Sequence, residues 1–111
     1  MQTSNPDAVA IELYIRYLNH KQFDMALSVL TSSAIVDENE RIYTALAITY
    51  HCRYQDKKDK IDLDNAALMI EKAMQLSNQY ALIFRVARDI YISANNKTKI
   101  VGVANALAQD K

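Results

Sequence analysis

Glycine and proline are nearly absent from this chain: its 111 residues include one glycine, Gly102, and one proline, Pro6. Hairpins, tight turns and phosphate-binding loops usually need several glycines, because glycine adopts positive φ values at little steric cost. Half of the residues are hydrophobic and 23% are charged, which leaves enough apolar surface for a folded core. The composition therefore predicts an all-α fold.

Apolar residues recur at helical spacing in six segments that short polar stretches separate. The segments cover residues 6–20, 23–35, 41–55, 63–76, 80–94 and 100–109. Ser4, Asn5 and Asp7 suit the beginning of the first helix, because capping side chains and negative charge stabilise a helix N-terminus. Since most connections are short, we expect three antiparallel helix pairs.

A charged run, DKKDKID, precedes the fourth segment at residues 56–62, and Ile61 is its only apolar residue. Mixed charge without apolar periodicity is typical of a solvated loop. The sequence predicts such a loop here, with a dedicated binding loop as the alternative.

A repeat becomes visible when the three pairs are aligned on Tyr17, Tyr50 and Tyr91. Ala26 lies nine residues after Tyr17, whereas the matching Ala66 lies 16 residues after Tyr50. The seven extra residues equal the length of the charged run. One insertion therefore brings the pairs into register.

The second pair resembles a tetratricopeptide repeat, a two-helix unit of about 34 residues. The residues that carry the resemblance are Tyr43, Leu46, Ala47 and Tyr50 in its first helix and Leu63, Ala66, Ile70 and Ala73 in its second. The resemblance implies one domain, a short α-solenoid of three stacked repeats at about 7–39, 40–79 and 80–111, with the insertion at about 56–62. It also implies that the alanines of residues 63–76 are packing residues. A six-helix bundle without repeats is the alternative.

The first helices of tetratricopeptide proteins line a concave groove that binds peptides or helices. Transferred by position, the resemblance implies a groove lined by Ala8, Ile11, Ile15, Leu18, Arg41, Thr44, Ile48, His51, Leu82, Arg85, Asp89 and Ile92. Its first two thirds are largely apolar, which favours an amphipathic helix as the partner. Simple core packing is the alternative for each apolar residue.

These features predict a non-enzymatic protein-binding module, an adaptor or chaperone that holds an apolar helix or an extended peptide. The architecture resembles the tetratricopeptide-like chaperones of bacterial type III secretion, which shield helical substrates. The last helix presents apolar residues on more than one face, so the second hypothesis is a self-associating scaffold or a segment of a longer solenoid.

Signals for other functions are weak. His20 and His51 lie in different helices, and the chain has no HExxH motif, no CxxC motif and no glycine-rich phosphate loop. Thirteen basic residues balance thirteen acidic ones, so no net charge favours nucleic acid. We expect no cofactor, metal, nucleic acid or membrane span, and we expect Cys52, the only cysteine, to be a packing residue in a reducing, cytoplasmic compartment.

Overall fold

The structure, a computed structural model, describes residues 6–77 and 81–109. Within these residues the chain forms helices and no strand, which confirms the predicted all-α class. The helices are α1 (Pro6–Asn19), α2 (Phe23–Val36), α3 (Glu40–Lys57), α4 (Lys60–Leu76), α5 (Ala81–Ser93) and α6 (Lys97–Gln109). The predicted capping by Ser4 and Asn5, the side chain of Asp7 and the predicted helical residue Tyr80 lie outside the described residues.

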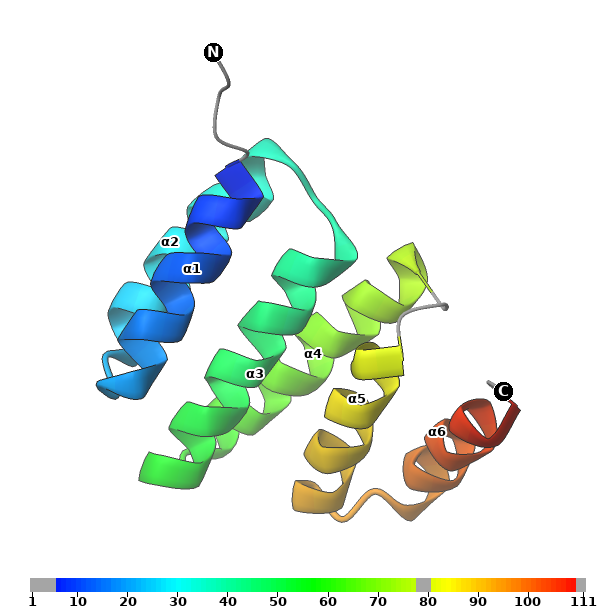
Figure 1. The fold of residues 1–111 in the computed structure, drawn as a ribbon. Helices are drawn as coiled ribbons and strands as arrows, with labels where there is room; N and C mark the ends of the chain where they lie inside the picture. The colour runs from blue at the N-terminus through cyan, green and yellow to red at the C-terminus, as the bar shows by residue number, and fades with distance from the viewer. Residues whose placement is uncertain (1–5, 78–80, 110–111) are drawn as a thin grey trace.

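The helices lie in a row of pairs, α1 with α2, α3 with α4 and α5 with α6 (Figure 1). Each helix contacts the next one along the chain, and the first helices of neighbouring pairs also contact each other, α1 with α3 and α3 with α5. These contacts place the faces of α1, α3 and α5 side by side. The tetratricopeptide assignment and the repeat boundaries stay predictions.

The core is built from the residues that the repeat alignment places inward. Ala66, Ile70 and Ala73 of α4 are fully buried, and so are Ile42 and Ala47 of α3. Burying an isoleucine side chain stabilises the fold by about 1.5–3 kcal/mol, and the small alanines let α3 and α4 approach closely. The prediction that the alanines of α4 are packing residues is confirmed for Ala66 and Ala73.

The charged run at 56–62 is largely helical, so the predicted loop is wrong. α3 continues to Lys57 and α4 begins at Lys60, which leaves only Lys58 and Asp59 between them. α3 and α4 have 18 and 17 residues, whereas α1 and α2 have 14 each. The seven inserted residues thus add about one turn to each helix of the middle pair.

Local capping explains why so short a connection suffices. Lys58 takes the left-handed conformation at φ 61° and donates its backbone N–H to the Tyr54 carbonyl at 2.6 Å. The Asp59 carboxylate accepts a hydrogen bond from the Ile61 N–H at 3.0 Å, which caps the beginning of α4. Residues of the two-residue connection therefore cap the end of α3 and the beginning of α4.

Asp62, within the charged run, is buried rather than solvated, with 3% of the residue exposed. Its carboxylate accepts hydrogen bonds from Arg53 Nε at 3.0 Å and from Arg53 Nη2 at 2.8 Å. Arg53 also donates from Nη1 to Asp24 on α2 at 2.7 Å. The Arg53 guanidinium therefore joins α2, α3 and α4 near the connection where α3 ends and α4 begins.

The last helix begins three residues earlier than the sequence predicted, at Lys97. Asn96 supplies the reason, because its Oδ1 accepts a hydrogen bond from the Lys99 N–H at 3.2 Å and so caps the first turn. Ile100, Val103 and Leu107 turn toward the core, and Val101 is the large apolar residue of α6 that stays exposed. Within its described residues, the outer face of α6 is less apolar than expected.

Candidate functional site

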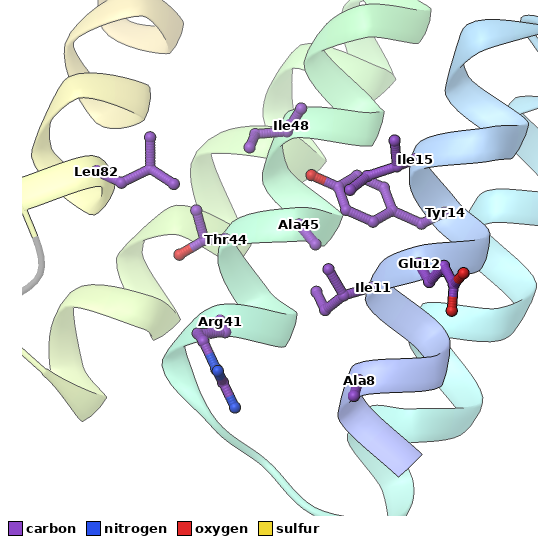
Figure 2. A pocket seen from close by; sticks show the side chains of 10 residues that line it. All are labelled: Ala8, Ile11, Glu12, Tyr14, Ile15, Arg41, Thr44, Ala45, Ile48 and Leu82. Carbon is purple, nitrogen blue, oxygen red and sulfur yellow. The ribbon is translucent and has the colours of Figure 1, made fainter. Parts of the chain in front are cut away.

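An apolar groove of about 590 Å³ runs between α1 and α3 and reaches the beginning of α5. Its lining residues are Ala8, Ile11, Glu12, Tyr14 and Ile15 of α1, Arg41, Thr44, Ala45 and Ile48 of α3, and Leu82 of α5. In Figure 2, Ile11 and Ile15 extend from α1 toward α3, and Leu82 extends from α5 toward Thr44. The volume lies within the roughly 300–1,000 Å³ that is typical of ligand sites.

Helical spacing explains why α1 presents this surface. Ala8, Ile11 and Ile15 are three and four residues apart, so they share one face of the helix. Ile15 is 48% exposed and Leu82 is 38% exposed, whereas Tyr14 and Ala45 are buried beneath them. The groove therefore has open apolar walls on a rigid, packed floor.

Seven of the predicted groove residues line this groove: Ala8, Ile11, Ile15, Arg41, Thr44, Ile48 and Leu82. Thr44 forms floor rather than wall, because it is 2% exposed and its hydroxyl donates to the Glu40 carbonyl at 2.6 Å. The sequence interpretation missed Glu12, Tyr14 and Ala45. Each lies three or four residues from a predicted lining residue on its own helix, so a wider stripe would have included all three.

The other five predicted residues lie outside this groove: Leu18, His51, Arg85, Asp89 and Ile92. Leu18 is half-buried and packs against the core. Arg85 and Asp89 are exposed, and Ile92 is 55% exposed. The predicted groove is therefore divided, with an apolar part near the beginning of α3 and a polar part along α5.

His51 joins α3 to α5 at the far end of the predicted groove. Its Nε2 lies 2.7 Å from the Ser93 hydroxyl, and its ring stacks on Tyr54 with an interplanar angle of 7°. Burial lowers the pKa of His51, and the nearby Asp89 carboxylate opposes that shift. The imidazole is accordingly neutral at physiological pH and acts as a structural contact between the two helices.

The arginines near the groove differ in whether they have a carboxylate partner. Arg16 pairs with Glu12 at 3.3 Å, and Arg88 lies 3.7 Å from Asp89. The side chains of Arg41 and Arg85 are exposed and make no hydrogen bond or ion pair within the part of the chain that the structure describes. Two arginines on the groove side thus have no ion-pair partner among the described residues.

Chemically reactive groups elsewhere have structural surroundings. Burial raises the pKa of the Cys52 thiol, which favours the unreactive protonated form. Glu71 accepts hydrogen bonds from Tyr91 Oη at 2.9 Å and from Lys99 Nζ at 2.6 Å, which ties α4, α5 and α6 together.

Residues 6–77 and 81–109 contain no group of three or more His, Cys, Asp or Glu side chains that could hold a metal ion. No described helix combines the length and the apolar character of a membrane span.

No protein-family model, no curated protein and no solved structure matches the chain.

Proposed function

We propose that this protein is a non-enzymatic binding module that holds an amphipathic helix of another protein in the groove between α1 and α3. The observation that carries the proposal is the apolar lining of that groove, in which Ile15 and Leu82 are exposed and Ile11 and Ile48 are half-buried. Large apolar side chains that gather at one exposed site usually mark a binding surface. An adaptor or a chaperone would use such a surface, and a cytoplasmic location is part of the proposal.

A helix fits this groove better than a compact ligand does, because the apolar lining follows about two turns of α1 and of α3. Anchors spaced three or four residues apart on a partner helix would meet Ile11 and Ile15 on one side and Ile48 on the other. The buried floor of the groove also needs little reorganisation when a partner binds, since Tyr14 and Ala45 are already fixed by packing. An extended peptide is the second form that the same surface would accept.

Exchange of Ile15 for Asp tests this proposal. We expect tagged wild-type protein to retain specific partners from a cell extract and the Ile15→Asp variant to lose them. A charge placed among apolar contacts should weaken a central contact by about 2 kcal/mol or more, roughly 30-fold in Kd. Because Ile15 is 48% exposed, circular dichroism should show unchanged helicity.

Ile61→Asp is the matched control, because Ile61 is 65% exposed on α4 and does not line the groove. It should retain the same proteins as the wild type, measured by quantitative mass spectrometry. If Ile15→Asp retains all partners, or if both variants lose them, the groove is not the binding site.

Self-association through α6 stays a second prediction with less support. Val101 is 58% exposed, but Ile100, Val103 and Leu107 pack inward. One exposed valine is a small surface for a stable interface, which usually buries about 800 Å² on each partner.

A further inference from the structure

Positive charge gathers at the end of the groove where α3 and α5 begin. Arg41 is the second residue of α3 and lines the groove directly. Arg85 lies three residues after Leu82, so it shares the face of α5 that carries this lining residue. Both side chains belong to helices that contact each other, and both are exposed.

The acidic side chains on this side form no ion pair with Arg41 or Arg85. Glu12 pairs with Arg16, and Asp89 Oδ1 lies 3.7 Å from Arg88 Nε. Within the part of the chain that the structure describes, neither Arg41 nor Arg85 has an ion-pair partner. Arg41 lines the apolar groove, and Arg85 lies outside its lining, on the face of α5 that carries Leu82. The chain as a whole has a formal net charge of zero, so these two arginines do not belong to a generally basic protein.

We infer that the groove selects an acidic amphipathic helix, whose apolar anchors contact Ile11, Ile15 and Ile48 and whose Asp or Glu side chains pair with Arg41 and Arg85. This inference rests on the proposed function and names the chemistry of its partner. Guanidinium groups bind carboxylates through two parallel hydrogen bonds, which fixes position as well as charge. The apolar walls supply affinity, and the arginines supply selectivity and the register of the helix.

Nucleic acid is the competing partner for exposed arginines. Binding of a strand requires cations that follow the phosphate backbone together with accessible stacking surfaces. Here isoleucines occupy the space between the charges, and Tyr14, the aromatic residue of the groove, is buried in its floor. The chemistry of the lining favours a helix with carboxylates at its edge.

Three synthetic helical peptides test the inference directly. All carry the same leucine stripe at i, i+3 and i+4 spacing and have blocked termini, which removes terminal charge. The positions that flank the stripe are Glu in the first peptide, Gln in the second and Lys in the third. Fluorescence anisotropy measures the Kd of each peptide for the full chain, and a single-stranded oligonucleotide serves as a fourth probe.

We expect the Glu peptide to bind about tenfold more tightly than the Lys peptide at low ionic strength, with the Gln peptide between them. The preference should largely disappear at about 1 M salt, where the Debye length is about 3 Å. The Arg41→Gln/Arg85→Gln variant should bind all three peptides with the Gln-peptide affinity. The control variant Lys60→Gln/Lys97→Gln also removes two positive charges, but at positions outside the groove lining, and it should keep the preference for the Glu peptide.

Each other result overturns a distinct statement. Equal binding of the three peptides, or tighter binding of the Lys peptide, would overturn the inference and leave the binding module intact. Tighter binding of the oligonucleotide than of the Glu peptide would replace the helix with nucleic acid. Absence of binding by every peptide would overturn the proposed function itself. If the arginine variant does not fold, the salt dependence of the wild type still decides the question.

Discussion

Arg53 should contribute more to stability than any other charged side chain in the described part of the chain, and exchange of Arg53 for Met tests this. The change leaves the Asp62 carboxylate, whose side chain is 4% exposed, without its donors at 2.8 and 3.0 Å. Removal of one partner from a buried ion pair costs about 3–5 kcal/mol. Because the Arg53 side chain is 23% exposed, water can partly replace it, so we expect about 3 kcal/mol.

Urea unfolding at neutral pH, followed by circular dichroism, measures this loss as a lower midpoint at unchanged slope. For a chain of this size the expected loss lowers Tm by about 12 °C. Asp24→Asn is the control, because Asp24 is 92% exposed and its bond to Arg53 should contribute less than about 1 kcal/mol.

The double variant Arg53→Met/Asp62→Leu removes both charges and should recover stability to within about 1 kcal/mol of the wild type. A loss below about 1 kcal/mol in Arg53→Met alone would refute the reasoning, since the pair would then behave as a surface ion pair.

Two further predictions concern pH. Burial raises the pKa of Glu71, but hydrogen bonds from Lys99 and Tyr91 lower it further, so its net pKa in the folded state is below the usual value. The stabilising contribution of Glu71 is therefore present above the unfolded carboxyl pKa of about 4.3 and is lost as the pH falls through the folded pKa. The difference in unfolding free energy between the wild type and Glu71→Gln should accordingly shrink in acid. Burial lowers the pKa of His51, so the unfolded chain binds more protons, and stability should fall as the pH drops from about 6.5 through the folded pKa. His51→Gln should remove that slope in urea titrations, and a His51 midpoint at or above about 6.5 by NMR would contradict the assignment.

The sequence predicted the helices well because each carries a strong local signal. Apolar residues at helical spacing located all six. Most observed helix ends lie within one residue of the predicted ones, whereas α4 and α6 each begin three residues earlier. The beginning of α6 differs by three residues because the capping role of Asn96 was not recognised. Where a side chain acts locally, as Asn96 does, the necessary information lies within a few residues.

The polar contacts could not be predicted in the same way, because they depend on tertiary neighbours. Asp62 lies in a run of seven residues with one apolar member, and its burial follows only from the approach of Arg53, nine positions away. His51 and Ser93 are 42 positions apart, and no spacing rule connects them. Part of the groove was predicted because repeat alignment supplies long-range neighbours, whereas individual ion pairs are particular to this chain.

The inserted turns and the groove lie at opposite ends of the middle pair, and this separates stability from binding. α3 begins beside the groove with Arg41 and Thr44 and ends at Lys57, near the bond between Arg53 and Asp62. A pair of turns added at the tip of a hairpin lengthens both helices together and leaves the register of their other end unchanged. Asp62 of the insertion can therefore fasten α4 to Arg53 of α3 while the lining of the groove keeps its position. On this argument the Arg53→Met variant, at a temperature where it remains folded, should bind the Glu peptide as the wild type does.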